Sequence, residues 1–321
     1  MLTYSFTATY VNPGTAVTVA IGGLTNSSTA GSYPAELTTN GTNNQGPSLP
    51  IDTGLAGPLT LTAGALVSPS WSISKGATGA SGAAYTYGFN TSTNGTLSSV
   101  TMTVPPGTAG TPAIASTAGV PSNGTAALSG TVLSYSFTAA HVSLGSAISI
   151  SISGITNTST TGTYVTQLTT NGSSASAPID NGLAGPLSFS AGTMGSPTWA
   201  TSTTAVGVAG VTYSISLTTA SGATFTSVSM SLPVGTVGTP AGGSVSGVPT
   251  GGTWSLAGTT LTYSFASIYL NPGTAVRLSV GGMTNTTKPG SYVAELTSNG
   301  STTNGASYPI DTGVTGAVTF R

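Results

Sequence analysis

The sequence predicts an all-β protein built from tandem antiparallel β-sandwich modules. Three observations support this prediction. Only 3% of the residues are charged while Gly, Ser, Thr and Val are abundant, so helix formers are scarce and strand and turn formers are plentiful. Apolar residues alternate with small polar ones over short stretches. The same pattern also returns about every 128 residues along the chain.

The sequence starts partway through a repeat. Leu133 and Leu261 each open a Leu-x-Tyr-Ser-Phe motif, and Leu2 opens a third copy of it. The segments led by Trp71 and Trp199 precede this motif in the two later copies and have no counterpart ahead of the first. We therefore expect three units: residues 1–64 as the C-terminal half of a module, and residues 65–192 and 193–321 as complete modules.

In the middle module, strands are expected wherever apolar residues recur at every second position. The expected strands contain, in order, Trp71 and Ile73; Tyr85, Tyr87 and Phe89; Val100, Met102 and Val104; Leu133, Tyr135 and Phe137; Ile148, Ile150 and Ile152; Tyr164 and Leu168; Leu187 and Phe189. Each of these strands has one apolar face. Two antiparallel sheets that bury their apolar faces against one another satisfy this pattern.

The other two copies follow the same plan. The third module repeats the apolar faces, and Gly, Pro and Asn-Gly pairs mark the turns between strands, as at Asn40-Gly41, Asn171-Gly172 and Asn299-Gly300. The half module is expected to begin directly with a strand over residues 2–6. The sandwich of which it is a part is therefore unfinished.

Composition excludes several classes of partner. The four basic and five acidic residues nearly cancel to a net charge of −1, so nucleic acid and anionic membranes are not expected to bind. No stretch of the sequence approaches the length of a membrane span, so membrane insertion is not expected either. Cys is absent, which leaves no thiolate to bind a metal and no disulfide.

The sequence also predicts no catalytic centre. The only histidine, His141, occupies the position that Tyr10 and Tyr269 hold in the other copies, so it is not the general base of a shared mechanism. A single histidine provides no metal cluster. We therefore expect no enzyme activity, no catalytic or metal-binding residues and no cofactor.

The recurrent aspartates have a structural interpretation. Asp52, Asp180 and Asp311 each stand in an Ile-Asp-x-Gly sequence, which is typical of a carboxylate that caps its own turn. A calcium site is the alternative. Since the acidic residue that could assist it in the other copies is Gln167 in the middle module, too few carboxylates are present for a cation that takes six to eight oxygen ligands.

Asn-x-Ser/Thr sequons are frequent and mark exposed turns. Six of them occupy two repeat-equivalent loops and are the candidates for N-glycosylation: Asn26, Asn40, Asn157, Asn171, Asn285 and Asn299. In a chain this rich in Ser and Thr, chance and turn chemistry are the alternative explanation.

Tryptophan residues are expected in the core. Trp71 and Trp199 are repeat-equivalent, and Trp71 shares a strand face with Ile73, so both are expected to anchor the core. Trp254 shares a face with Leu256 and is expected to pack there. An exposed platform that stacks against a sugar ring is the alternative for Trp254.

The surface features favour assembly. Soluble β-sandwiches protect their edge strands with charged residues, and this chain has few to place there. We therefore expect edge strands and the unfinished half module to pair with neighbouring copies. Within the half module, Leu2, Tyr4 and Phe6 are the candidates for strand pairing between chains.

Four motifs carry a family resemblance: Thr-Tyr-Ser-Phe, Pro-Gly-Thr-Ala-Val, Leu-Thr-Asn-Ser-Ser-Thr-Ala-Gly-Ser-Tyr and Ile-Asp-Thr-Gly. With them the whole chain resembles the tandem immunoglobulin-like repeats of secreted bacterial or archaeal surface proteins, which include S-layer, adhesin-stalk and filament components. The resemblance implies an extracellular or cell-surface structural protein without catalytic residues.

Three functions remain open on this basis. The leading hypothesis is a structural subunit of an extracellular filament or surface layer, a homopolymer whose partners are copies of itself. The second is an adhesin stalk or carbohydrate-binding module, for which cell-surface glycans would be the partner. A phage or virion fibre would suit the same composition.

Overall fold

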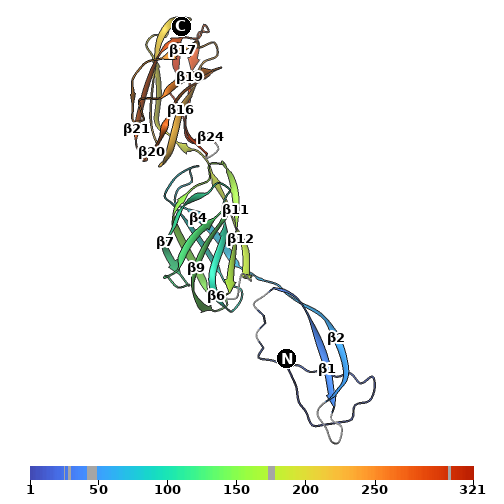
Figure 1. Ribbon diagram of the computed structural model, residues 1–321. Helices are drawn as coiled ribbons and strands as arrows, with labels where there is room; N and C mark the ends of the chain where they lie inside the picture. The colour runs from blue at the N-terminus through green and yellow to red at the C-terminus, as the bar shows by residue number, and fades with distance from the viewer. Residues whose placement is uncertain (25, 28–29, 42–48, 173–177, 303–304) are drawn as a thin grey trace.

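The computed structural model describes residues 1–24, 26–27, 30–41, 49–172, 178–302 and 305–321. All regular structure within these ranges is β, which confirms the predicted fold class. Figure 1 shows three units in a line, from an N-terminal hairpin through the middle module to the third module.

The middle module is a sandwich of two sheets. Its strands are β3 (Gly64–Ala65), β4 (Val67–Ile73), β5 (Ala83–Asn90), β6 (Gly95–Thr103), β7 (Ala109–Ala118), β8 (Thr125–Ser129), β9 (Val132–Val142), β10 (Ala147–Thr156), β11 (Gly162–Gly172) and β12 (Pro178–Phe189). One sheet has the order β4-β5-β10-β7 and the other β3-β12-β11-β6-β9-β8. Neighbouring strands are antiparallel except β3 and β12, which are parallel.

This strand order is that of an immunoglobulin-like domain. Strands β4, β5, β10 and β7 correspond to the A-B-E-D sheet, and β12, β11 and β6 correspond to the G-F-C sheet. The hairpin β8–β9 comes between strands D and E in the sequence and widens the second sheet beside β6. The immunoglobulin-like prediction is thereby confirmed.

The third module repeats this topology with some strands divided. Its strands are β13 (Gly192–Thr193), β14 (Gly195–Thr201), β15 (Ala209–Thr218), β16 (Ala223–Ser231), β17 (Val237–Ala241), β18 (Val245–Ser246), β19 (Thr253–Ala257), β20 (Thr260–Leu270), β21 (Ala275–Thr284), β22 (Gly290–Tyr292), β23 (Glu295–Ser301), β24 (Ser307–Val314) and β25 (Val318–Phe320). The two main sheets run β14-β15-β21-β17 and β13-β24-β23-β16-β20-β19.

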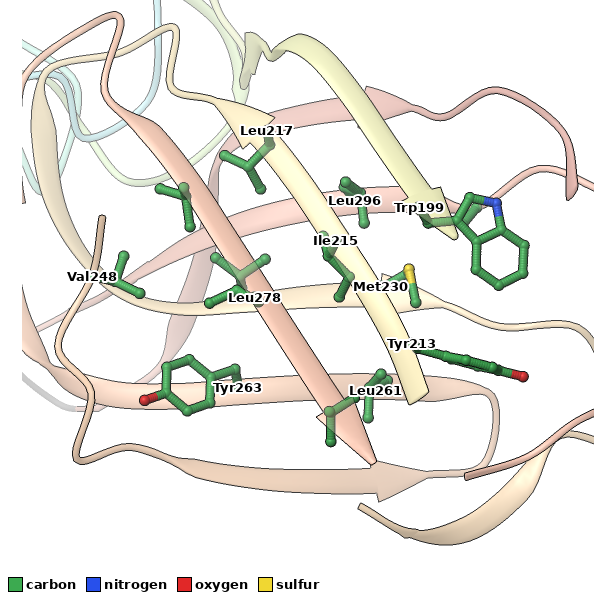
Figure 2. Packing of buried hydrophobic residues seen from close by; sticks show 14 of the residues in the cluster. Trp199, Tyr213, Ile215, Leu217, Met230, Val248, Leu261, Tyr263, Leu278 and Leu296 are labelled. Carbon is green, nitrogen blue, oxygen red and sulfur yellow. The ribbon is translucent and has the colours of Figure 1, made fainter. Parts of the chain in front are cut away.

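Each complete module has its own hydrophobic core, formed by the apolar faces that alternate along its strands. The core of the middle module joins side chains of both sheets, among them Tyr87 from β5 and Tyr135 from β9. In the third module, Figure 2 shows Trp199, Ile215 and Leu278 among the core residues. Burying such side chains contributes about 1.5–3 kcal/mol each, so each core is large enough to stabilise its module.

The half module has no such core. Strand β1 (Gly31–Gly41) pairs with β2 (Leu49–Leu61) in an isolated two-stranded sheet. Residues 1–24 form no strand, so the prediction of a strand over residues 2–6 is wrong. The strands that flank the equivalent segments in the complete modules have no counterpart in the half module, and a strand without neighbours leaves its backbone groups without ladder hydrogen bonds.

The middle and third modules meet through polar contacts of their loops. The hydroxyl of Thr78, in the β4–β5 loop, donates a hydrogen bond to the carbonyl of Pro309 (2.5 Å). The backbone N–H of Ser81 in the same loop donates to the carbonyl of Gly222, between β15 and β16 (2.8 Å). These bonds join residues of different modules and fix the joint at two points.

Candidate interaction surface

An exposed apolar face distinguishes the half module from its two copies. Tyr4 exposes 62% of its surface, whereas its repeat equivalents Tyr135 and Tyr263 expose 0% and 1%. Leu2 and Phe6 expose 60% and 62%, and their counterparts are buried as well. The rings of Tyr4 and Phe6 stack on each other with their centroids 5.8 Å apart. These three residues thus present a surface that is covered elsewhere in the chain.

The covering comes from strands in the first half of a module. Tyr135 lies in β9, which pairs with β6 on one side and β8 on the other. Its hydroxyl donates to the carbonyl of Pro121 and accepts from the N–H of Gly124 (3.1 Å). Tyr263 makes the same two bonds in the third module. All of these partners precede the Leu-x-Tyr-Ser-Phe motif in sequence, so the half module offers none of them to Tyr4.

A second exposed stretch lies further along the half module. It consists of alternating apolar residues, namely Val17, Val19 and Ile21. Their equivalents in β10 are buried, namely Ile148, Ile150 and Ile152. Strand β10 is held between β5 and β7, which again belong to the first half of the module.

The hairpin β1–β2 forms because both of its strands belong to the half module. Its register matches the complete module, since Thr39 pairs with Asp52 as Thr170 pairs with Asp180. Leu37 on β1 is nevertheless exposed, whereas its equivalent in β11 is buried where β11 pairs with β6. The hairpin therefore keeps its backbone pairing and lacks its packing.

The recurrent aspartate binds a distant loop. The Asp180 carboxylate accepts bonds from the backbone N–H groups of Ser92 (3.0 Å) and Thr93 (3.3 Å) and from both of their hydroxyls (2.9 Å and 2.5 Å). It is fully buried beside Gly64, where a Cβ would lie 2.2 Å from Oδ1. The predicted cap of its own turn is therefore wrong, because the donors lie in the β5–β6 loop, 88 positions away for Ser92.

The other two aspartates differ in whether the equivalent loop is present to bind them. Asp311 is buried and accepts from the N–H groups of Ala220 (3.0 Å) and Ser221 (3.3 Å), which are the equivalent donors of the third module. Asp52 is exposed and bonds to the Thr39 hydroxyl within its own hairpin (3.2 Å). The half module contains the carboxylate without the loop that it binds in the complete modules.

The six candidate sequons lie in three different environments. Asn157 is buried, and its Nδ2 donates to the carbonyls of Lys75 (2.7 Å) and Ala77 (2.8 Å). Asn285 makes the equivalent bonds to Thr203 and Ala205. A glycan on either nitrogen would break these bonds, so the candidates Asn157 and Asn285 are incompatible with the folded modules.

The remaining sequons are more accessible. Asn171 is half-buried, and its Nδ2 bonds to the Ser99 hydroxyl (3.3 Å). Asn299 is also half-buried and bonds to hydroxyls of β16. Asn26 and Asn40, both in the half module, are exposed. Glycosylation at these four residues stays a prediction.

The tryptophans lie in or against the cores, as expected. Trp71 and Trp199 are buried. Trp254 packs against the core of the third module with its ring centroid 4.9 Å from that of Tyr263. Because Tyr263 is buried, it cannot form an exposed sugar-stacking cluster with Trp254.

The described residues offer little material for a catalytic or metal site. A shallow groove of about 310 Å³ on the third module is lined by Thr198, Ser216, Arg277 and other residues of the β14-β15-β21 sheet. Within the described ranges, no three His, Asp or Glu side chains gather closely enough to bind a metal ion. The same ranges contain no apolar helix of the length needed to span a bilayer.

Comparisons with known proteins give a fold-level likeness only. No family model and no curated protein matches the sequence. Among solved structures, a transglutaminase of red sea bream aligns with 79% of this chain at 10% identity and a TM-score of 0.32. The aligned region is 31% of the transglutaminase, so this chain spans about a third of its length.

Two bacterial surface proteins are also similar. The C-terminal domain of the Streptococcus agalactiae AgI/II polypeptide BspA aligns with 77% of this chain and 99% of its own, at 9% identity and a TM-score of 0.26. The collagen adhesin of S. aureus aligns with 80% of this chain and 94% of its own, at 10% identity and a TM-score of 0.23. Similarity at this level carries no argument about function.

Proposed function

We propose that this chain is part of an extracellular stalk, a stiff row of immunoglobulin-like modules that holds another element away from a cell surface. The joint between the middle and third modules is the observation that supports it most. A row of modules serves as a spacer when neighbouring modules keep a fixed orientation, and loop contacts at each joint are the means of fixing it.

The joint has a tight steric fit besides its hydrogen bonds. The ring of Tyr308 in the third module lies against Gly79 of the middle module, where a Cβ would come within 2.5 Å of the Tyr308 hydroxyl. Burial raises the pKa of Tyr308 above its ordinary value. Gly79 has a φ of +65°, a conformation that glycine adopts without strain. Glycine at position 79 therefore permits both the turn and the close approach of the Tyr308 ring.

The composition suits exposure outside a cell. With nine charged side chains among Asp, Glu, Lys and Arg, few interactions in the folded modules change with salt or with moderate changes of pH. We propose a non-catalytic role on the same basis.

Assembly into a filament or surface layer is the second candidate. It is favoured by Leu2, Tyr4 and Phe6, whose exposed apolar face suits strand pairing with another chain. It is also favoured by the edge strands β4, β7 and β8, which contain no Lys, Arg, Asp or Glu to discourage pairing.

Small-angle X-ray scattering tests the stiff joint. Gly79→Ala places a methyl group against Tyr308 and is expected to broaden the distribution of interatomic distances, because the third module then changes orientation. Gly207→Ala is the matched control, since Gly207 is the repeat equivalent with a φ of +69° and the nearest atom to its Cβ is 3.7 Å away. Identical scattering of both variants and the unmodified chain would contradict a joint fixed by this contact.

Location is tested separately. Immunogold electron microscopy with antibodies against the third module is expected to place the label outside the cell and at a constant distance from its surface. Label within the cytoplasm would contradict the stalk. Label along continuous fibres that contain only this chain would favour the filament.

A further inference from the structure

We infer that Asn123 carries an N-linked glycan, and that this glycan keeps the edge strands β7 and β8 of the middle module from pairing with other chains. Asn123 begins an Asn-Gly-Thr sequon in the turn between these strands and lies outside the six candidates named above. N-glycosylation modifies exported proteins, so this inference rests on the proposed extracellular function.

The turn around Asn123 is anchored to the core. Tyr135 is fully buried, and its hydroxyl donates to the carbonyl of Pro121 and accepts from the N–H of Gly124 (3.1 Å). Gly124 has no space for a side chain, because a Cβ would lie 2.3 Å from the carbonyl oxygen of Ser136. The turn is therefore held on both sides of Asn123, which is itself exposed.

Both reacting groups of this sequon are accessible. Asn123 and Thr125 are exposed, and among the described residues neither the Asn123 amide nor the Thr125 hydroxyl has a hydrogen-bond partner. The amide must present Nδ2 to the sugar donor, and the Thr hydroxyl completes the sequon that a transferase recognises. A glycan can therefore be attached here without breaking a contact of the fold.

Two further sequons of the middle module also lie outside the six candidates, and each has one of these groups engaged. In the sequon at residues 90–92, the Ser92 hydroxyl donates to the buried carboxylate of Asp180 (2.9 Å). The Asn94 side chain accepts a hydrogen bond from the N–H of Leu144 through its Oδ1 (2.6 Å), which holds the amide against the β9–β10 turn. Both are therefore poorer acceptors in the folded chain than the sequon of the β7–β8 turn.

The turn joins two unprotected edge strands. Strands β7 and β8 are each an outer strand of their sheet, and neither contains Lys, Arg, Asp or Glu. Strand β7 has 10 residues, of which only Pro112 is of a kind that discourages pairing, and Figure 1 shows it along one side of the middle module. A glycan is bulky and hydrated, so one at this turn hinders the approach of a strand to either edge.

The third module has the same turn with no acceptor in it. The Tyr263 hydroxyl donates to the carbonyl of Pro249 (2.7 Å) and accepts from the N–H of Gly252 (3.0 Å). Gly251 occupies the position that Asn123 holds in the middle module. The two modules therefore share the geometry of the turn and differ in the presence of the amide.

The edge of the third module is interrupted instead. Gly242 and Gly243 have φ of +65° and +99° and separate β17, with 5 residues, from β18, with 2 residues. Short and broken edge strands pair poorly with another chain. The sequon therefore occurs on the module whose edge strand is continuous, which is the distribution expected of a shield.

Attachment requires a transferase and a lipid-linked sugar pyrophosphate. The Asn123 Nδ2 forms a bond to the anomeric carbon of the sugar. The bond from that carbon to the pyrophosphate oxygen breaks, and its electron pair stays on the pyrophosphate. The amide proton passes to a base of the transferase.

Glycosylation in vitro tests the acceptor. The folded chain is incubated with an oligosaccharyltransferase that recognises Asn-x-Ser/Thr alone and with a lipid-pyrophosphate-linked oligosaccharide, and peptide mass spectrometry locates the glycans. Occupancy of Asn123 is expected to exceed that of the buried Asn157 and Asn285 by at least about 10-fold, because those amides are freed only when a module opens. Thr125→Ala should abolish transfer to Asn123, and Ser122→Ala, next to the sequon, should leave it unchanged.

Sedimentation velocity tests the shield. After the transfer reaction the Ser122→Ala chain carries the glycan at Asn123 and the Thr125→Ala chain does not, while both keep every other sequon. The Thr125→Ala chain is expected to form larger oligomers at concentrations at which the glycosylated chain does not. Before the reaction the two chains should associate equally.

Three results would overturn the inference. The first is absence of transfer to Asn123 in the folded chain, and the second is equal association of the two variants after the reaction. The third is an extracellular chain, isolated from its own source, whose Asn123 is unmodified. That result would leave the stalk standing, whereas a chain found in the cytoplasm would contradict both proposals.

Discussion

Residues 1–61 and residues 132–189 follow nearly the same pattern and have different structures. In the middle module the pattern forms four strands, β9 to β12, whose apolar faces are buried. In the half module it forms only the hairpin β1–β2, with exposed side chains along nearly all of its length. The comparison teaches that alternation defines which residues are able to form a strand, and that neighbouring strands decide whether the strand forms.

The largest difference in stability is expected at the repeat-equivalent tyrosines Tyr135 and Tyr4. Tyr135→Ala removes a fully buried ring and two hydrogen bonds, and is expected to destabilise the middle module by about 3–5 kcal/mol. Tyr4→Ala, the equivalent change in the half module, is expected to alter the free energy of unfolding by less than about 0.5 kcal/mol. Urea unfolding of both variants measures the two effects. Equal losses would show that Tyr4 is packed in solution.

The repeat-equivalent aspartates Asp180 and Asp52 should show a somewhat smaller difference in their contribution to stability. Asp180→Ala removes a buried carboxylate and its bonds to half-buried Ser92 and exposed Thr93, and is expected to cost about 1.5–3 kcal/mol. Asp52→Ala removes one exposed bond to Thr39 and is expected to cost less than about 0.5 kcal/mol. Thermal unfolding of both variants provides the measurement. A stable Asp180→Ala protein would contradict the structural role of the carboxylate.

A pair of glycines tests packing against strand β4. A Cβ on Gly182 would lie 3.0 Å from the Cβ of Leu66 and 3.3 Å from Pro69, so Gly182→Ala is expected to destabilise the middle module by about 1–2 kcal/mol. The equivalent Gly54 has no atom within 4 Å of a Cβ, and Gly54→Ala should be neutral. A neutral result at both positions would mean that β4 moves aside without cost.

The smallest expected effect on stability is the one that alkaline pH has on the complete modules. Burial raises the pKa of Tyr85, Tyr87 and Tyr213 above the ordinary value. Below about pH 10 these phenols are neutral in both states, and above it the unfolded chain loses their protons first, so the stability of the complete modules is lost as pH rises through the folded pKa values. Melting temperatures should stay level to about pH 9 and fall above pH 10.

A single substitution sharpens that prediction. The Tyr87 hydroxyl is buried without a hydrogen-bond partner among the described residues. Tyr87→Phe should therefore fold at least as stably near pH 7 and lose less stability above pH 10. An unchanged alkaline profile in this variant would exclude Tyr87 as a source of the effect.

The sequence predicted the parts of the fold that depend on local pattern. The alternation at Tyr85 and Tyr87 or at Ile148 and Ile150 marked strands correctly, and Trp71 was correctly placed in the core. The β-sandwich followed from alternation and regular turns, and the immunoglobulin-like class from the resemblance that the four motifs carry. These features are properties of short segments, which is why a single sequence contains them.

Long-range contacts could not be predicted in the same way. The donors of Asp180 lie 88 positions away for Ser92, and no local signal connects them. Asn157 resembles an exposed sequon and is instead buried, because its amide bridges Tyr85 and the carbonyl of Lys75. The strand predicted over residues 2–6 does not form, for the same reason. Its partner strands lie elsewhere in a complete module, and no local signal shows whether they are present.

Hydrogen exchange along the unmodified chain tests the central claim most directly, because it compares three copies of one pattern in one molecule. Residues 133–156 and 261–284 are expected to exchange slowly, and residues 1–24 at nearly the rate of an unstructured peptide. Equal protection of all three segments would contradict the claim that the second half of a module folds only with its first half.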